Sequence, residues 1–314
     1  MTDMRKVAFL FAGQGAQTVG MGRDFADTVP ESGAVFSMGE ALRTGITQIC
    51  FGTGSQMDGA LLGQTANTQP CLFLTDLAIA EAFRAVGLLP AAVAGFSLGE
   101  IPAAAFAGVL SYEEAFRFVL LRAESMAWQS GRHPGGMAAA LKLAPEVVEE
   151  ICSRFSEVWP VNYNCPGQVS CAGSAAEIDD FCAAVRQAGG RAVKLPVSGA
   201  FHTPYMAQVA PVLRAALDGA DVSAPAIPLY ANRTASPSPA DRAGILDCMT
   251  LQVCSPVRWE STLRAMWTAG ITTFVEVGAG HTLTGFVSRT LPEARALTVN
   301  DIPSFEAVCR ELTE

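Results

Sequence analysis

One short motif, GFSLG at residues 95–99, presents a serine in the setting that nucleophilic catalysis requires. Its two glycines allow the chain to turn sharply from a strand into a helix, so that the hydroxyl of Ser97 projects outward. The bare pattern often occurs by chance, but an apolar run at 91–95 and an alanine-rich run at 100–108 provide the strand and helix that it needs. We therefore interpret Ser97 as a nucleophile rather than as an ordinary turn serine.

A serine hydroxyl becomes nucleophilic only when a neighbouring base takes its proton, and the chain has 3 histidines for that role. His202 lies where an inserted segment would rejoin the main domain, and residues at such a junction often line a cleft. His133 lies in a loop rich in glycine and proline, and His281 follows a glycine-rich turn, so both also fit ordinary surface histidines. Spacing alone does not rank His202 above His281 as the base.

The elements that must position these residues alternate between short buried strands and helices. This alternation favours the α/β fold class with a parallel sheet. We expect strands at residues 6–11, 91–95 and 274–277 and helices at 70–86, 100–108 and 111–128. Ser111, followed three residues later by Glu114, has the pattern of a capping box and marks the start of the last of these helices.

The stretch from about residue 131 to 198 has a different order of predicted strands and helices, which predicts a small inserted domain. We expect strands at residues 136–143, 158–162, 168–172 and 191–197 and helices at 145–155 and 174–188. This strand–helix–strand–strand–helix–strand order is that of a ferredoxin-like unit. The predicted organisation is a discontinuous large domain of residues 1–130 plus 200–314, interrupted by a small domain of residues 131–199.

Composition and charge exclude several classes of protein. Hydrophobic residues make up 50% of the 314 residues and charged residues 16%, which predicts a globular, soluble protein with a sizeable core. No apolar run approaches the roughly 20 residues of a membrane span, and the first residues do not resemble a signal peptide, so we expect a cytoplasmic protein without membrane contact. The net charge of -9 argues against a nucleic acid partner. The 9 cysteines lack zinc-site spacing, so we expect reduced thiols and no metal.

Spaced motifs along the whole chain resemble, in their order, those of the malonyl-CoA:acyl carrier protein transacylase family. They are FAGQGAQ at 11–17, GFSLGE at 95–100, LRAE at 121–124, NYNCPGQV at 162–169, GAFH at 199–202, LQVCSPVRW at 251–259 and EVGAGHTLTG at 276–285. Such a series is far more specific than one serine motif. The resemblance implies a hydrolase-like α/β domain with a parallel sheet and a ferredoxin-like insertion.

The resemblance also implies a role for each catalytic group. Ser97 would be the nucleophile and His202 the base, oriented by the backbone carbonyl of Gln252 where hydrolases use a carboxylate. The backbone amides of Gln14 and Leu98 would form an oxyanion hole, which stabilises charge that develops only during the reaction.

Substrate selection would rest on residues around the acyl group. Arg122 would pair with the free carboxylate of the malonyl group, a task that suits a planar guanidinium fork. Phe201 would fill the space that an α-methyl branch needs, whereas Phe96 stands where the family commonly has histidine and leaves the chemistry of the acyl pocket open. Asn162 and Gln168 would line the cleft, although a buried turn role fits them nearly as well.

The implied reaction is the transfer of a malonyl group from malonyl-CoA to the phosphopantetheine thiol of an acyl carrier protein, through a malonyl-serine intermediate. It requires no metal or other cofactor. Three rivals stay open: a relative with a different extender acyl group, a serine hydrolase, and an inactive module that docks a carrier protein. Fatty acid and polyketide synthesis both remain candidate host pathways.

Overall fold

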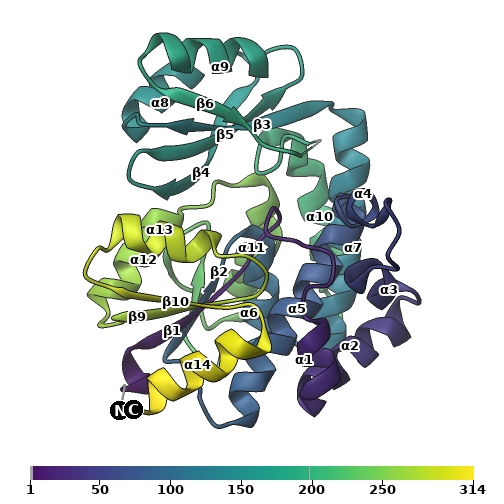
Figure 1. The fold of residues 1–314 in the computed structure, drawn as a ribbon. Coiled ribbons are helices and arrows are strands. Elements are labelled where there is room, and N and C mark those ends of the chain that lie inside the picture. The colour runs from purple at the N-terminus through teal and green to yellow at the C-terminus, as the bar shows by residue number, and fades with distance from the viewer. Residues whose placement is uncertain (1–2, 198) are drawn as a thin grey trace.

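The computed structural model describes residues 3–197 and 199–314, and a six-stranded sheet lies among helices in the lower part of Figure 1. Neighbouring strands follow the order β10, β9, β1, β2, β7, β8. Their bounds are β1 Val7–Phe11, β2 Ala92–Gly95, β7 Leu229–Ala231, β8 Ser236–Pro237, β9 Thr273–Val277 and β10 Arg295–Val299. All neighbours pair in parallel except β7 and β8, which are antiparallel. The predicted α/β class with a parallel-sheet core is confirmed.

Helices surround this sheet, and the two longest, α5 and α7, pack against each other (Figure 1). The bounds are α1 Arg23–Thr28, α2 Pro30–Leu42, α3 Ile46–Phe51, α4 Asp58–Leu62, α5 Thr65–Ala85, α6 Glu100–Phe106, α7 Tyr112–Arg132, α10 Val209–Ala216, α11 Arg242–Leu251, α12 Trp259–Thr268, α13 Thr282–Thr290 and α14 Ile302–Thr313. The capping box of Ser111 and Glu114 is confirmed at the start of α7, which runs on to Arg132 rather than ending at residue 128. Within the described ranges, none of the helices combines the length and apolar character that crossing a membrane requires.

The alternation of side chains along β1 explains why helices cover both faces of the sheet. Successive residues of a strand point to opposite faces, and all five residues of β1 are buried. Val7, Phe9 and Phe11 belong to one apolar cluster, which they share with α5 and α6. Ala8 and Leu10 belong to a second cluster, which they share with α12 and α13. Both faces of the strand therefore need a helical layer, as parallel sheets generally do.

The start of α5 differs from the sequence-based expectation. The helix begins at Thr65 and contains Pro70 in its interior, although proline is usually confined to the first turn because it has no N–H to donate. The carbonyl of Ala66, four residues before Pro70, instead accepts a hydrogen bond from Arg43 Nη1 (2.8 Å). A distant side chain thus satisfies the carbonyl that proline leaves without a donor, and the local sequence does not indicate this contact.

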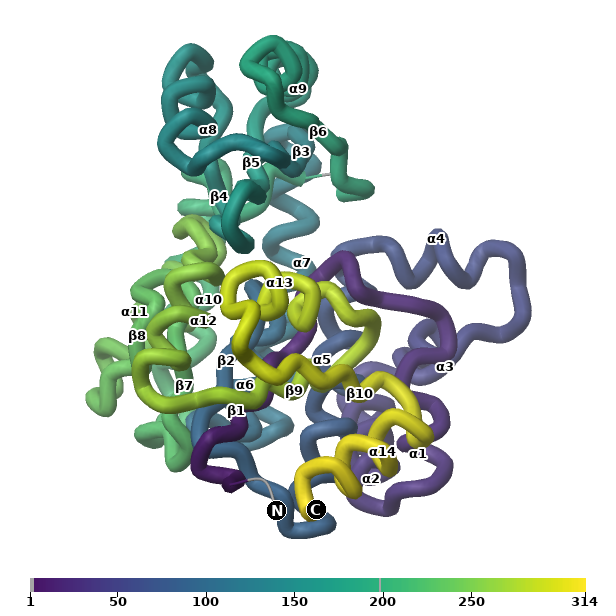
Figure 2. Tube along the Cα trace, turned by 60° about the vertical axis from the view of Figure 1, so that its left-hand side comes forward, coloured from purple at the N-terminus to yellow at the C-terminus, as the bar shows by residue number. Residues whose placement is uncertain are grey.

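A second sheet lies over one end of the first, and Figure 2 shows it standing apart from the larger layer. Its elements are β3 Gly135–Leu141, α8 Pro145–Cys152, β4 Val158–Cys165, β5 Gln168–Ser174, α9 Ile178–Gln187 and β6 Arg191–Lys194. The strands follow the order β4, β5, β3, β6, and every neighbouring pair is antiparallel. The boundary expected at residue 131 falls inside the last turn of α7.

Backbone hydrogen bonds tie the second sheet to the segment that leads into α12. Val257, just before α12, donates its N–H to the carbonyl of Val161 in β4 (2.8 Å). Its own carbonyl accepts from the N–H of Tyr163 (2.9 Å). The edge strand β4 is therefore fixed above the carboxyl ends of the parallel strands, where α/β proteins usually bind their ligands.

Candidate active site

Ser97 is the first residue of the 3-10 helix η2 (Ser97–Gly99), directly after the sharp turn that follows β2. Its φ of 54° is in the left-handed region, which is strained for a residue other than glycine. Close packing requires the flanking glycines: a Cβ on Gly95 would lie 1.9 Å from the Gly99 carbonyl, and one on Gly99 would lie 2.2 Å from the carbonyl oxygen of Phe11. Asn232 Oδ1 accepts a hydrogen bond from the N–H of Ser97 (2.7 Å), which holds the turn in this conformation.

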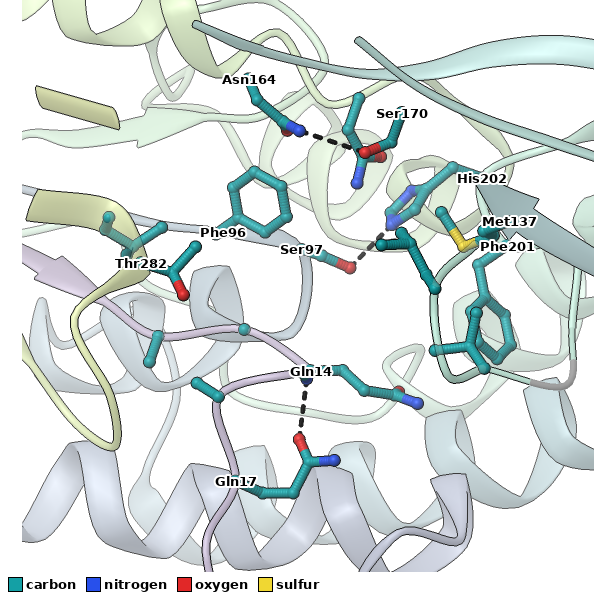
Figure 3. Close-up of a pocket in the computed structure, with 18 of the residues that line it drawn as sticks. Gln14, Gln17, Phe96, Ser97, Met137, Asn164, Ser170, Phe201, His202 and Thr282 are labelled. Atoms are coloured by element: carbon teal, nitrogen blue, oxygen red, sulfur yellow. Dashed lines mark hydrogen bonds between the residues drawn. The ribbon is translucent and has the colours of Figure 1, made fainter. Parts of the chain in front are cut away.

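The histidine next to Ser97 is His202, whose Nε2 lies 2.7 Å from the serine Oγ (Figure 3). Its Nδ1 lies 2.9 Å from the carbonyl oxygen of Gln252 and 3.1 Å from that of Ser255. Because both carbonyls can only accept, the proton of a neutral ring belongs on Nδ1, and Nε2 is left to accept the proton of the serine. Burial, reinforced by the charge of Arg122, lowers the pKa of His202 to about 4, so the ring is neutral at neutral pH.

The other two histidines lie elsewhere on the surface. His133 is exposed, and its ring stacks on that of Tyr205 with centroids 4.9 Å apart. His281 is exposed at the residue before α13. Of the three histidines, only His202 is hydrogen-bonded to Ser97 in the described part of the chain, and this geometry favours it as the base.

The Ser97 hydroxyl and the His202 ring face a cavity of about 300 Å³ between the two sheets (Figure 3). The segments that follow β1 and β2, the carboxyl end of β9 and the helix α13 line it from the large sheet, and strands β3, β4 and β5 line it from the small one. The carboxyl ends of three parallel strands thus converge on one site, and the second sheet covers it.

Arg122 on α7 brings a buried positive charge to the serine. The residue is 1% exposed, and its Nη2 lies 3.4 Å from Ser97 Oγ. Nη1 donates to Gln69 Oε1 (2.6 Å), and Nη2 donates to Gln252 Oε1 (2.9 Å). Burial lowers the pKa of Arg122 to about 10, which still leaves the guanidinium charged at neutral pH. Its hydrogen-bonding partners among the described residues are neutral groups, so the charge can receive a carboxylate that enters the cavity.

The loop that carries Gln14 lies directly against the serine turn. A Cβ on Gly13 would be 2.4 Å from the carbonyl oxygen of Phe96, so only glycine permits this approach. The Gln14 side chain donates to Thr65 Oγ1 (3.2 Å), while no described residue accepts a hydrogen bond from the backbone N–H of Gln14 or of Leu98. Both amides are therefore available to a ligand, as an oxyanion hole requires.

The remaining candidate residues line the walls of the cavity. In Figure 3 the Ser97 hydroxyl lies between the ring of Phe96 and that of Phe201. Phe96 packs edge-on against Trp259, with ring centroids 5.4 Å apart, and Phe201 is 6% exposed. Asn162 is buried, and its Oδ1 has no hydrogen-bond partner among the described residues.

Gln168 has a partner that the sequence did not indicate. Its Oε1 accepts a hydrogen bond from Arg289 Nη1 (2.8 Å), and Arg289 also lies over the ring of Phe286. Gln168 therefore lines the cavity while it connects the small sheet to α13, so its position at the cleft and a structural role coincide.

Four residues that contact the catalytic groups were missed at the level of sequence: Gln69, Glu100, Asn232 and Ser255. Glu100 Oε2 accepts hydrogen bonds from Gln252 Nε2 (2.7 Å) and from the N–H of Asn232 (3.3 Å). Burial raises the pKa of Glu100 to about 7. Two of the four lie in motifs that carry the family resemblance, Glu100 at the end of GFSLGE and Ser255 within LQVCSPVRW, whereas Gln69 and Asn232 lie in none of these motifs.

Known proteins resemble this chain over nearly its whole length. The family described as the acyl transferase domain matches residues 8–310. The malonyl CoA-acyl carrier protein transacylase of Bacillus subtilis is 33% identical over 99% of this chain and 98% of its own length. The solved malonyl-CoA:acyl carrier protein transacylase of Xanthomonas oryzae pv. oryzae has a TM-score of 0.92 at 32% identity, with 99% of both chains covered. A malonyl-transacylase solved in complex with its type II PKS acyl-carrier protein has a TM-score of 0.92 at 29% identity, covering 98% of this chain and 99% of that chain.

Proposed function

The chain belongs to the malonyl CoA-acyl carrier protein transacylase family, and on this premise we propose that it transfers a malonyl group from malonyl-CoA to the phosphopantetheine thiol of an acyl carrier protein. One observation carries the proposal. Ser97 Oγ lies 2.7 Å from a neutral base, His202 Nε2, and 3.4 Å from the buried guanidinium of Arg122. The base can take the proton of the serine, and the guanidinium can bind the carboxylate that distinguishes malonyl from acetyl.

In the first step Ser97 Oγ attacks the thioester carbonyl carbon of malonyl-CoA while His202 Nε2 takes the hydroxyl proton. The carbon–sulfur bond then breaks, and the departing thiolate of coenzyme A takes that proton from the imidazolium. The products are malonyl-Ser97, coenzyme A and a neutral His202. The carbonyls of Gln252 and Ser255 keep the proton of Nδ1 in place, so that the ring can exchange a proton only at Nε2.

In the second step the phosphopantetheine thiol of the carrier protein attacks the ester carbonyl of malonyl-Ser97. His202 Nε2 accepts the thiol proton and returns it to Ser97 Oγ as the carbon–oxygen bond breaks. Every bond change is an acyl or proton transfer, so we expect no resident cofactor and no metal. Both steps pass through an oxyanion, which the free backbone amides of Gln14 and Leu98 would stabilise.

Two cavity-lining residues, Arg122 and Phe201, would select among acyl groups. Arg122 would receive the malonyl carboxylate, while Phe201 limits the volume available next to the α-carbon. A cavity enclosed by the second sheet would also keep bulk water from competing with the carrier thiol. Asn162 offers an unpartnered Oδ1 at the cavity wall for a donor on the bound acyl-CoA.

The two sheets support a division into a large and a small domain. The division predicted from the sequence was residues 1–130 with 200–314 and residues 131–199. Because α7 ends at Arg132, we place the first transition just after this residue, and we assign 1–132 with 200–314 to a hydrolase-like domain and 133–199 to a ferredoxin-like insertion. The strand order β4, β5, β3, β6 in an antiparallel sheet supports the ferredoxin-like assignment. The cytoplasmic location stays a prediction.

The test is to incubate the protein with radiolabelled malonyl-CoA, with and without a holo acyl carrier protein. Label that appears on the carrier only when enzyme is present supports transfer. Free malonate in place of labelled carrier would mean that the protein is a hydrolase, and an absence of label on both proteins would mean a docking module. Parallel assays with carriers from fatty acid and polyketide systems would assign the pathway by the ratio of their kcat/KM values.

A further inference from the structure

The side-chain amide of Gln252 connects the groups that form the site. Its Oε1 accepts from Arg122 Nη2 (2.9 Å), while its Nε2 donates both to the carbonyl oxygen of Ser97 and to Glu100 Oε2, each at 2.7 Å. Gln252 is 1% exposed, so water cannot substitute for any of these partners. This role belongs to the side chain and is separate from that of the Gln252 backbone carbonyl, which contacts His202.

The orientation of this amide matters because its two ends differ. With the oxygen toward Arg122, the amide accepts from the guanidinium; turned by 180°, it would direct its NH₂ group at a cation that can only donate. Two acceptors on the opposite side, the Ser97 carbonyl and the Glu100 carboxyl group, hold the NH₂ end away from Arg122. Of these two acceptors, only the Glu100 carboxyl group can carry a negative charge. When it is ionised, the hydrogen bond that it accepts from Gln252 is stronger than the one accepted by the Ser97 carbonyl.

Glu100 also supports the serine turn from behind. Its Oε2 accepts from the N–H of Asn232 (3.3 Å), and the side chain of Asn232 binds the turn at two points. Asn232 Oδ1 accepts from the N–H of Ser97 (2.7 Å), and Asn232 Nδ2 donates to the carbonyl of Gly95 (2.6 Å). Glu100 is 1% exposed and does not line the cavity, and its carboxylate is hydrogen-bonded to Gln252 and Asn232 rather than to Arg122, so its effect on a substrate must pass through its neighbours.

We propose that Glu100 is a positioning residue for recognition of the malonyl carboxylate: it fixes the Gln252 amide with its oxygen toward Arg122, and thereby sets the place of the guanidinium beside Ser97. Because Gln252 lies between them, Glu100 does not itself occupy a donor of Arg122, whereas a direct ion pair would do so. The guanidinium stays available for the carboxylate of the substrate. This inference rests on the proposed function, since it concerns the choice of malonyl over acetyl.

The proposal is tested by the ratio of kcat/KM for malonyl-CoA to that for acetyl-CoA in acylation of Ser97. Both values come from one preparation, so the fraction of folded enzyme cancels from the ratio. Glu100→Met, which keeps the volume but removes the acceptor, should lower the ratio by roughly tenfold, the effect of one hydrogen bond to a charged group. Glu100→Gln keeps an oxygen acceptor and should restore most of the ratio. The control Glu81→Met alters a buried carboxylate that binds Arg84 and Tyr112 outside the cavity, and it should leave the ratio unchanged.

A double-mutant cycle with Gln252→Met separates positioning from general damage, because that change removes the amide and keeps the backbone carbonyl that orients His202. If Glu100 acts through Gln252, the double variant should have the ratio of Gln252→Met alone. Additive losses, or a Glu100→Met variant with the ratio of wild type, would overturn the proposal. A wild-type protein that does not take malonyl from malonyl-CoA would instead refute the proposed function, so the two failures are distinguishable.

Discussion

Arg122 Nη2 lies 3.4 Å from Ser97 Oγ, although the two residues come from different elements, and the side chain of Gln252 is hydrogen-bonded to both. The serine is fixed by the turn after β2, and the arginine projects from the middle of α7. A substrate that is acylated at Ser97 must therefore place its α-carbon and any second carboxylate next to a buried cation. The proposed nucleophile, Ser97, and the proposed carboxylate-binding group, Arg122, thus belong to one site.

Arg122→Met should abolish preference for malonyl while it preserves the ability to acylate Ser97. The change keeps most of the side-chain volume but removes the partner of a carboxylate in a buried site, where such losses amount to about 3 to 5 kcal/mol, or on the order of hundredfold or more in kcat/KM. Acetyl-CoA has no second carboxylate and should retain or gain activity. Acylation rates with both thioesters measure the effect, and equal losses for the two would show that Arg122 is structural.

The pH dependence of acylation should follow the lowered pKa of His202. Burial and the charge of Arg122 reduce this pKa to about 4, so the neutral base is present from above pH 5 through neutrality. As the pH falls through about 4, the ring becomes protonated, and the rate should fall about tenfold for each further pH unit. Labelling of Ser97 by an uncharged fluorophosphonate reports this profile without titration of the substrate. Circular dichroism at each pH controls for unfolding. An inflection of the labelling rate near pH 6.5, the pKa of an ordinary histidine, would contradict the assignment of the buried His202 as the base.

Methylmalonyl-CoA should be a poor substrate because Phe201 occupies the cavity wall next to the base. One extra methyl group in a filled pocket costs typically about 1 to 3 kcal/mol, or roughly ten- to two-hundredfold in specificity. Phe201→Ser should therefore raise the methylmalonyl to malonyl ratio of kcat/KM. Phe96→His is the matched comparison: its ring packs against Trp259 and Phe286, so this change should mainly alter the rate. Equal transfer of both acyl groups by the wild type would contradict the steric argument.

How far the sequence alone predicts this site depends on how local each interaction is. The turn at Ser97 was predictable because GFSLG lies between an apolar strand and a helix, and the capping box of α7 was predictable because it spans four residues. The parallel sheet followed from the alternation of buried strands and helices. The turn and the capping box are formed by residues that are close together in the sequence. The sheet could be predicted because runs of apolar residues indicate buried strands.

Interactions between distant residues were the ones that sequence reasoning missed. Asn232 binds a serine 135 residues away, and Arg43 satisfies a carbonyl in α5 that Pro70 leaves without a donor. No periodicity or short motif encodes such pairs, because the partners are distant in the sequence and come together only in the folded structure. For the same reason spacing did not decide between His202 and His281, whereas the resemblance of the motifs did assign a role to His202.

The central claim, that Ser97 carries the malonyl group between two thiols, is tested most directly by intact-mass measurement. After exposure to malonyl-CoA, the wild-type protein should gain the mass of one malonyl group, lose it on addition of holo acyl carrier protein, and yield malonylated carrier. Ser97→Ala should gain no mass, while the surface control Ser236→Ala should behave as the wild type does. Malonylation of the Ser97→Ala protein, or loss of the group from wild type as free malonate without malonylated carrier, would contradict the account.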